Sequence, residues 1–359
     1  MKAAVSRAHA EPLHLEEVEL APVDAGEVRV RLAACAICHS DIAYMDGAWG
    51  GYPPTVFGHE AAGFVEEIGD GVVGLAPGEP VVVTLMRSCG QCPCCSRGLY
   101  GACEGDFPLS RKTVLTDAAG EKLAQGMGTA AFAEQVLVDA SQIVAVPANV
   151  PLESAALLAC GVITGYGAVA NTARIEPGSD IVVIGAGGVG LNAIQGGVLC
   201  AANRIVAVDI SDDKLDAAME FGATHGINSS RQDAVAEVRS QTGGRGADYV
   251  FITVGAKPAF DQSYAMLARG GAAVLVGMPA NGVMSEFEIG AFAGNAQRIL
   301  GSKMGSANIH VDIPALAQQY LEGRLKLDEL ISGRYPLADI DQAIASVKRG
   351  EARRNVILF

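Results

Sequence analysis

A glycine-rich turn between two apolar segments, over residues 181–209, is the feature that most constrains the fold of this chain. Ile181–Ile184 is a continuous apolar run, as expected for a parallel strand that is covered on both faces. The sequence GAGGVG follows directly at 185–190, then a helical stretch, and then a second apolar run that ends in Asp209. This order of strand, glycine turn, helix, strand and acid predicts a βαβ unit that binds a dinucleotide.

The turn and the acid have separate expected roles in this unit. Glycines permit the tight turn and the close approach of a pyrophosphate, and the helix N-terminus supplies positive potential. The turn residues expected to contact the cofactor are Gly185, Gly187, Gly188, Val189 and Gly190. Asp209 would accept hydrogen bonds from the adenosine ribose and repel a 2′-phosphate, and no arginine follows it directly, so NAD is favoured over NADP. The alternative is an ordinary βαβ turn without a ligand.

Strand-like and helical segments alternate through the rest of this region. Apolar runs at 249–252, 272–276 and 299–302 predict strands, and 214–221 and 259–267 predict helices. Such alternation is typical of a doubly wound parallel sheet. Because 359 residues are too many for one ordinary core, a second domain is also expected.

A second group of residues, within 38–60 and at Cys160, predicts a reactive metal site. Two thiolates and an imidazole, from Cys38, Cys160 and His59, are a ligand set of a catalytic zinc that keeps its fourth position open. Taken singly, each cysteine could equally be a buried apolar residue and the histidine a loop residue. Their occurrence together with a Gly-His-Glu sequence at 58–60 favours the metal.

Three polar residues beside these ligands are expected to assist catalysis. Ser40 would offer its hydroxyl to a substrate oxygen on the metal. Asp41 would orient the ligand imidazole through its other ring nitrogen. Glu60 follows the histidine and would tune the field at the metal or bind it transiently, or else serve only as a structural carboxylate.

Five of the nine cysteines lie within fifteen residues and predict a second, structural zinc. The expected ligands are Cys89, Cys92, Cys95 and Cys103. Cys95 is preferred over the adjacent Cys94 because it keeps the first two spacings equal. Disulfide pairing is the alternative, and a reducing compartment does not favour it.

The remaining segments predict an irregular β-rich unit around these sites. Strands are expected within 1–35 and at 61–69, 81–83 and 128–138, a polar surface loop at 104–127, a helix at 152–169, and a tail with amphipathic stretches at 314–321 and 340–347 before a closing apolar run at 355–359. The net charge of −14 argues against a nucleic-acid partner. No run of about twenty apolar residues and no signal-peptide core are found, so a cytoplasmic protein without a membrane partner is expected.

Together these motifs resemble those of the zinc-containing alcohol dehydrogenases of the medium-chain dehydrogenase/reductase superfamily. The resemblance covers essentially the full length and rests on Cys38-His39-Ser40-Asp41, Gly58-His59-Glu60, the four spaced cysteines, Cys160-Gly161, the glycine turn with Asp209, and Arg354. It implies an α/β architecture in which a Rossmann doubly wound parallel sheet domain, 162–303, is inserted in a β-rich GroES-like catalytic domain. The catalytic domain would comprise 1–161, with the structural zinc lobe at 89–103, and the return segment 304–359.

The resemblance also implies roles for residues that carry no signal of their own. His39 and Arg354 would contact the cofactor pyrophosphate, and Lys214 the adenosine ribose. Without it, Lys214 and Arg354 would be interpreted as solvated surface charges. By position, an apolar substrate pocket would be lined by Trp49, Leu85 and Met278. Such a lining suits a primary or aromatic alcohol, although Trp49 could instead only fill the domain core.

The implied reaction is reversible hydride transfer between an alcohol and NAD. Zinc would act as a Lewis acid on the alcohol oxygen, and the hydroxyl of Ser40 would accept the departing proton in a relay through the nicotinamide ribose. Many relatives carry a histidine five residues after the first zinc-binding cysteine, and here that position is Ala43. The proton is therefore expected to leave through water or a neighbour such as Tyr44.

Other functions are weighed against this one. A thiol-dependent formaldehyde dehydrogenase is the main alternative, for which Arg111 and Lys112 would supply basic groups. A zinc-free quinone reductase would lack both cysteine sets, and a zinc-ribbon module that binds nucleic acid is opposed by the acidic charge. The resemblance implies a homo-oligomer, and the long 104–127 segment favours a dimer over a tetramer.

Overall fold

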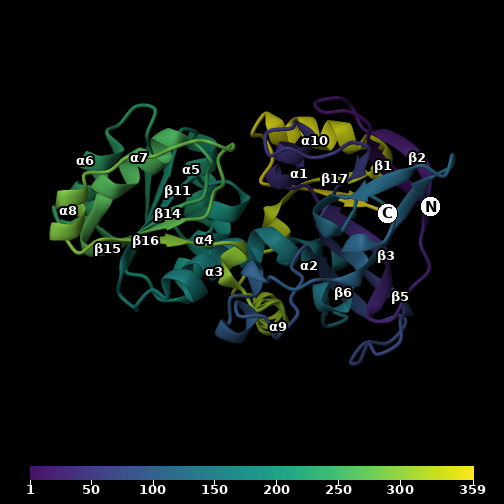
Figure 1. Ribbon diagram of the computed structural model, residues 1–359. Helices are drawn as coiled ribbons and strands as arrows, with labels where there is room; N and C mark the ends of the chain where they lie inside the picture. The colour runs from purple at the N-terminus through teal and green to yellow at the C-terminus, as the bar shows by residue number, and fades with distance from the viewer. The chain divides into compact units, whose positions relative to one another are not determined.

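The computed structural model describes all residues, 1–359, and divides into two compact units. The first unit comprises Met1–Cys160 and Asn308–Phe359, and the second comprises Gly161–Ala307. The first boundary, after Cys160, falls one residue before the boundary expected from the sequence. The second boundary, after Ala307, falls four residues after the expected one. Each unit has its own sheets and is described by itself, with the element labels of Figure 1.

The first unit is built from a small closed barrel and a larger, mostly antiparallel sheet. The barrel order is β1-β2-β7-β8-β4, with bounds β1 Lys2–Ser6, β2 His14–Leu20, β4 Thr55–Val56, β7 Leu115–Asp117 and β8 Lys122–Gln125. The sheet order is β10-β6-β5-β3-β18-β17, with β9 also paired to β3. Its bounds are β3 Glu27–Ala36, β5 Glu60–Ile68, β6 Pro80–Thr84, β9 Gln135–Asp139, β10 Ile143–Ala145, β17 Ile331–Pro336 and β18 Arg354–Leu358.

Side chains alternate between buried and exposed along β3, the strand that pairs with β5, β9 and β18. Val28, Val30 and Leu32 are buried, whereas the intervening Arg29 and Arg31 are partly or fully exposed. A strand with period-two alternation packs one face on the core and turns the other to solvent. β18, from the end of the chain, lies beside β3 in antiparallel register, so the tail completes this sheet as expected.

Two expectations for the middle of the chain were wrong. The 104–127 segment is not only a surface loop, because β7 and β8 form a hairpin in which Leu115 and Leu123 pair and are buried. These two leucines, separated by a turn around Gly120, gave too short a pattern to distinguish from loop sequence. Over 128–138, strand pairing begins only at Gln135, since the preceding glycines and alanines adopt irregular backbone.

One long helical segment, 152–173, joins the two units in sequence. It consists of α2 Leu152–Leu157, a π-helical turn over Leu158–Val162, α3 Ile163–Gly167 and a second π-helical turn over Ala168–Ala173. By length and composition it could cross a membrane, but 78% of its most apolar window is buried inside the protein, as in a core helix. Cys160 lies in the first π turn, a distortion that is frequent at functional sites.

Short helices complete the first unit, and two of them lie in its return segment. Their bounds are α1 His39–Met45, α9 Ile309–Leu321 and α10 Ile340–Lys348. On α10, Ile340, Ala343, Ile344 and Val347 are buried, which is the spacing of one apolar helix face. This face packs into the same core as the barrel and sheet.

The second unit is a six-stranded parallel sheet in the order β13-β12-β11-β14-β15-β16. Its strands are β11 Asp180–Ile184, β12 Arg204–Asp209, β13 His225–Asn228, β14 Ala247–Ile252, β15 Leu267–Leu275 and β16 Arg298–Gly301. The helices that follow α3 in this unit are α4 Gly188–Leu199, α5 Asp212–Glu220, α6 Ala234–Gln241, α7 Lys257–Met266 and α8 Ile289–Gly294. Helices flank the strands on both faces (Figure 1). This order reverses between β11 and β14, which is the arrangement of a Rossmann fold.

Candidate active site and cofactor loop

The metal site begins at the end of β3, where the chain turns into α1. Cys38 is the residue before the helix, and Asp41 lies in its first turn with no exposed surface. One carboxylate oxygen of Asp41 accepts the backbone N–H of Cys38 at 3.3 Å, and the other accepts that of Gly58 at 2.8 Å. Asp41 therefore ties the two sequence motifs of the site together.

A glycine is required at position 58 to bring the histidine inward. Gly58 has φ +92°, and a Cβ there would lie 2.5 Å from the backbone nitrogen of Phe132. Left-handed backbone and this close approach both exclude larger residues. The turn directs His59 into the protein just before β5 begins at Glu60.

The buried imidazole of His59 has one satisfied and one unsatisfied nitrogen. Nδ1 lies 3.0 Å from an oxygen of Asp41, and Nε2 has no hydrogen-bond partner. Burial alone would lower the pKa of His59, but the charges of Asp41 and Cys38 outweigh it and raise the pKa well above its usual value. A fully buried ring nitrogen without a protein partner, held by a carboxylate on its other side, fits a metal ligand.

Three further potential metal-ligand residues lie close to His59. The donor atoms of Cys38, His59, Glu60 and Cys160 all lie within 4.8 Å of one another, and all four residues are buried. The hydrogen bond from Cys160 and the neighbouring His59 lower the pKa of Cys38 well below its usual value, despite burial. A thiolate is the form of cysteine that binds metals, so the donor set suits zinc.

Glu60 faces a buried arginine from the far end of the chain. Nη1 of Arg354, in β18, donates to an oxygen of Glu60 at 3.1 Å and to the carbonyl of Ile37 at 3.4 Å. Burial raises the pKa of Glu60 to about 8, although the charge of Arg354 opposes the shift. Arg354 is only 5% exposed, so the interpretation of it as a solvated surface charge was wrong. Its Nε and Nη2 have no hydrogen-bond partner in the protein.

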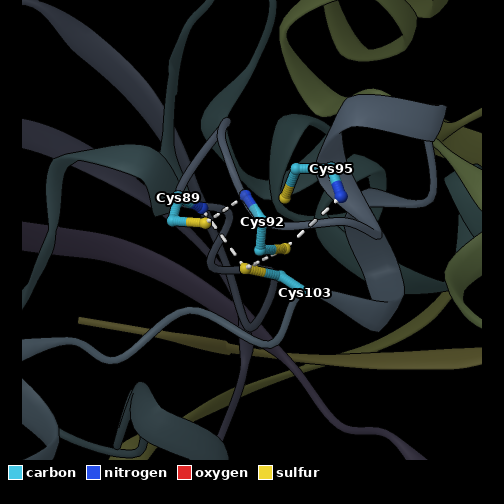
Figure 2. Close-up of side chains that lie close together, drawn as sticks. All are labelled: Cys89, Cys92, Cys95 and Cys103. Atoms are coloured by element: carbon cyan, nitrogen blue, oxygen red, sulfur yellow. Dashed lines mark hydrogen bonds between the residues drawn. The ribbon is translucent and has the colours of Figure 1, made fainter.

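The four-cysteine lobe forms a second donor cluster in the same unit. Figure 2 shows Cys89, Cys92, Cys95 and Cys103 with their sulfur atoms turned toward one another, and these atoms also lie within 4.8 Å. Cys94 is not in the cluster, and no cysteine in the chain forms a disulfide.

Backbone amides point at the sulfur atoms of this lobe. The N–H of Cys92 donates to the sulfur of Cys89 at 3.3 Å, and that of Cys95 to the sulfur of Cys92 at 3.4 Å. The amides of Cys95 and Glu104 lower the pKa of Cys92 to about 6. Amide donors favour the thiolate form of Cys92, whereas burial raises the pKa of Cys95 to about 12, so Cys95 would become a thiolate only with a metal bound.

Arg87, two residues before the lobe, binds several later segments of the chain, and the sequence did not indicate this role. Its guanidinium donates to Gln142 at 2.6 Å, to Ser110 at 2.9 Å and to the carbonyl of Gly128 at 2.7 Å. It also lies over the ring of Phe107, 6.0 Å from the centroid. No local pattern indicates this role, because all of these partners are more than twenty positions away except Phe107.

The glycine turn of the second unit has the shape that a dinucleotide requires. Gly185 has φ +95°, and a Cβ on Gly190 would lie 1.8 Å from the carbonyl oxygen of Gly185. Around Gly187, by contrast, a Cβ would meet nothing within 4 Å. The first and third glycines are thus needed for the turn and its packing, and the second leaves open space for a pyrophosphate at the start of α4.

Asp209 closes this turn at the end of β12. One of its oxygens accepts the N–H of Ala186 at 2.8 Å, and the other accepts those of Ile210 at 2.8 Å and Ser211 at 3.1 Å. These bonds fix the carboxylate beside the glycine turn, with 9% of the residue exposed.

The other residues expected at the site are placed as follows. In the first unit, Ser40, Trp49 and Leu85 are half-buried and His39 is exposed at the start of α1. In the second unit, Lys214 is half-buried on α5 and Met278 is 63% exposed. The rings of Tyr44, Trp49 and Phe57 form an aromatic group beside α1, with centroids 5.4 Å and 6.4 Å from Tyr44.

A buried thiolate and imidazole site in a barrel-containing unit, with a Rossmann unit in the same chain, defines a zinc-dependent nicotinamide dehydrogenase. Two family models match: the alcohol dehydrogenase GroES-like domain over residues 24–148 and the zinc-binding dehydrogenase domain over 188–321. The chain belongs to the zinc-containing alcohol dehydrogenases of the medium-chain dehydrogenase/reductase superfamily. Zinc and a nicotinamide cofactor are the groups that this family uses.

Relatives with assigned names show how broad this family is. The chain is 35% identical over 365 residues to a probable S-(hydroxymethyl)glutathione dehydrogenase of Schizosaccharomyces pombe, covering 99% of this chain and 96% of that protein. An alcohol dehydrogenase zinc-binding domain protein from Burkholderia ambifaria has 35% identity and a TM-score of 0.95, covering 100% of this chain and 98% of that one. Benzyl alcohol dehydrogenase from Acinetobacter calcoaceticus has 30% identity and a TM-score of 0.93, covering 100% and 99%.

Proposed function

We propose that this protein oxidises primary or aromatic alcohols with NAD, and reduces the corresponding aldehydes, at a zinc held by Cys38, His59 and Cys160. The observation that carries the proposal is the buried His59, whose Nε2 lacks a protein partner while Asp41 holds Nδ1. Bound zinc would supply a Lewis acid that favours the alkoxide of the substrate near neutral pH.

The protein's own residues then have distinct tasks at this site. Asp41 holds the imidazole in one tautomer and one orientation. Ser40, half-buried one residue before Asp41, takes the hydroxyl proton of the substrate. Glu60 adds a buried carboxylate whose second oxygen has no partner, so it tunes the field at the metal or binds it transiently. In the second cluster, the four cysteines would hold a structural zinc.

NAD is the cofactor that the second unit favours. The carboxylate of Asp209 is fixed beside the glycine turn by three backbone amides, so it cannot swing away from a ribose 2′-phosphate. A fixed carboxylate at this place accepts ribose hydroxyls and repels a phosphate. His39, Lys214 and Arg354 are proposed as further cofactor contacts, and the two unpartnered nitrogens of Arg354 are suited to an anionic group.

An aromatic or primary alcohol suits the residues beside α1. Tyr44 and Trp49 are half-buried and offer ring surface next to Ser40, and the buried Phe57 packs against Tyr44. Together with Leu85, these residues favour an apolar substrate over a charged one.

Oxidation of a thiol adduct of formaldehyde is the second candidate, because the relative from Schizosaccharomyces pombe has that activity in its name. The basic residues that would favour it are already engaged. Lys112 is bound by Asp24 at 2.6 Å and Glu27 at 2.7 Å, and Arg111 by Asp106 at 2.5 Å. Lys112 is therefore not a free cation for an acidic thiol substrate, and the neighbouring Asp106 carboxylate offsets the charge of the exposed Arg111, so the plain alcohol is preferred.

A homodimer in a reducing, cytoplasmic compartment is proposed as the working form. In the second unit, β16 is an edge strand of the sheet. Large apolar side chains are exposed on it and on the segment before it: Met278, Val283, Met284, Phe287, Ile289 and Ile299. A sheet edge with exposed apolar residues favours pairing with a second copy. Nine thiols without a disulfide fit a reducing compartment.

Two measurements on the purified protein test this function. We expect two zinc ions per chain, and NADH formation from benzyl alcohol and from a short alkanol that is lost after chelation. Formaldehyde is tested in parallel wells with and without glutathione. Activity only in the well with glutathione and formaldehyde would reject the preferred substrate class in favour of the second candidate, and no zinc would reject both.

A further inference from the structure

We propose that Thr253 is a positioning residue for the cofactor, because its hydroxyl fixes one peptide group of the glycine turn; the inference rests on the NAD binding proposed above. Thr253 follows the last residue of β14, and β14 pairs with β11 in the parallel sheet. The glycine turn follows β11, so Thr253 lies beside the start of this turn. Thr253 would therefore act through the backbone of the turn, without touching the cofactor.

The hydroxyl of Thr253 lies against two carbonyl oxygens. Its Oγ1 is 2.7 Å from the oxygen of Gly185 and 3.0 Å from that of Ile184. A hydroxyl has one proton, so the shorter contact identifies the Gly185 carbonyl as its main acceptor. Threonine is restricted at χ1 by its branched Cβ, and this restriction keeps the hydroxyl at that carbonyl.

The same peptide group is fixed from the opposite side by Asp209. The carbonyl of Gly185 and the N–H of Ala186 belong to one peptide group, which is planar. Asp209 accepts this N–H at 2.8 Å, while Thr253 donates to the carbonyl. The two strands that flank β11, namely β12 and β14, thus each supply one side chain to this peptide. The peptide cannot rotate without breaking one of these two bonds.

The orientation of this peptide affects the amides that follow it. The backbone N–H groups at the start of α4 are donors for a pyrophosphate, and Gly187 leaves open space in front of them. Their direction depends on the turn, in which Gly185 has φ +95°. If the peptide were free, the turn would adopt the binding conformation only part of the time, and the apparent affinity would fall by that fraction. Thr253 is therefore expected to strengthen cofactor binding by organising the turn in advance.

The space beneath the turn suits a hydroxyl at this position. A Cβ on Gly190 would lie 3.0 Å from Oγ1 of Thr253, and a Cβ on Gly185 would lie 3.1 Å from it. The hydroxyl therefore packs against both glycines that the turn requires. A methyl group in its place would lie closer to the Gly185 carbonyl oxygen than the ~3.3 Å of an ordinary carbon–oxygen contact. Valine at position 253 would lose the hydrogen bond and also displace this carbonyl.

The test measures binding of the cofactor and of two of its fragments. Wild type and Thr253→Val are titrated with NADH by fluorescence, and bound NADH is then displaced with ADP-ribose or with adenosine. We expect the Kd of NADH and of ADP-ribose to rise about tenfold in the variant, as for loss of one buried hydrogen bond. The Kd of adenosine should not change, because adenosine lacks the pyrophosphate and Asp209 is still held by the amides of Ile210 and Ser211.

Two further readouts separate positioning from a general effect on the fold. Thr253→Ser keeps the hydroxyl and should restore most of the affinity for NADH. Hydride transfer to saturating NAD, measured in a single turnover with benzyl alcohol, should stay within about twofold of wild type in Thr253→Val, because only binding is weakened. Thr253→Ala, which removes the hydroxyl without adding a methyl group at the carbonyl, is used if the valine variant does not fold.

Thr242 provides a matched control in the same unit. Its hydroxyl also donates to two carbonyls, those of Val238 at 2.8 Å and Arg239 at 3.2 Å. It lies between the end of α6 and the start of β14, at the edge of the sheet opposite the glycine turn. Thr242→Val should therefore lower the melting temperature and leave the Kd of NADH unchanged.

The outcomes distinguish this inference from the proposed function. An unchanged Kd of NADH in a folded Thr253→Val or Thr253→Ala would overturn the inference, and so would an equal loss of adenosine binding. A serine variant as weak as the valine variant would also overturn it. Wild type that does not bind NADH would overturn the proposed function, and this inference with it.

Discussion

Replacing Asp41 by asparagine tests the central claim about the metal site. The carboxylate of Asp41 has no exposed surface and contacts three groups: the N–H of Cys38, the N–H of Gly58 and Nδ1 of His59. Asparagine has nearly the same shape, but it is neutral, and one of its two terminal atoms is a donor. In the orientation that still accepts from Gly58 and His59, its amide nitrogen faces the N–H of Cys38.

The expected cost has two parts. Loss of a carboxylate that orients a metal-bound histidine costs about 10–100-fold in metal affinity, which corresponds to about 1.4–2.7 kcal/mol. A buried N–H that faces another donor costs a further ~1–3 kcal/mol of folding stability. We therefore expect Asp41→Asn to bind zinc at the His59 site at least about tenfold more weakly, and to unfold at lower temperature.

The four-cysteine lobe provides an internal control for this measurement. Zinc is titrated away with a chromogenic chelator, and total zinc is counted by mass spectrometry. In the variant, we expect one ion to leave at about tenfold lower chelator concentration, while the ion held by the four cysteines leaves as in wild type. If both ions leave as in wild type, Asp41 does not support a metal ligand and the reasoning about His59 is refuted. Loss of both ions together would instead indicate general unfolding.

Three further predictions follow from other parts of the structure. Cys95→Ser should remove the structural zinc and lower the melting temperature. Cys94→Ser is the matched control and should keep two zinc ions per chain. Equal zinc content in the two variants would contradict the assigned ligands. Gly190→Ala should abolish NADH binding measured by fluorescence titration, because the added Cβ would lie 1.8 Å from the carbonyl oxygen of Gly185. Unchanged affinity would show that the turn can relax and would contradict this steric requirement. Arg7 lowers the pKa of Asp117, so this carboxylate stabilises the fold above its unfolded pKa and loses that effect as the pH falls through its folded pKa. Thermal melts of Asp117→Asn should therefore differ from wild type at pH 7 and converge in acid, and a constant difference would argue against the charge as the cause.

Local chemistry in the sequence was enough for the parts of the protein that act over short distances. The glycine turn is one example, because left-handed backbone at Gly185 and the contact of Gly190 with the Gly185 carbonyl are steric requirements within six residues. The four-cysteine lobe is another, since its closely spaced thiols form a motif that is typical of a structural zinc site. The strand and helix alternation likewise predicted the parallel sheet, whose order the structure then gave.

The tertiary structure decided the pairs that are far apart in the chain. Glu60 and Arg354 are 294 positions apart, and they meet because β18 lies beside β3, a register set by the packing of the whole sheet. Burial places the Arg354 guanidinium beside Glu60, whereas the sequence without the family resemblance would indicate a solvated surface charge. Sequence pattern records what a residue requires of its neighbours along the chain, whereas contacts between distant elements arise from the packing of the completed fold.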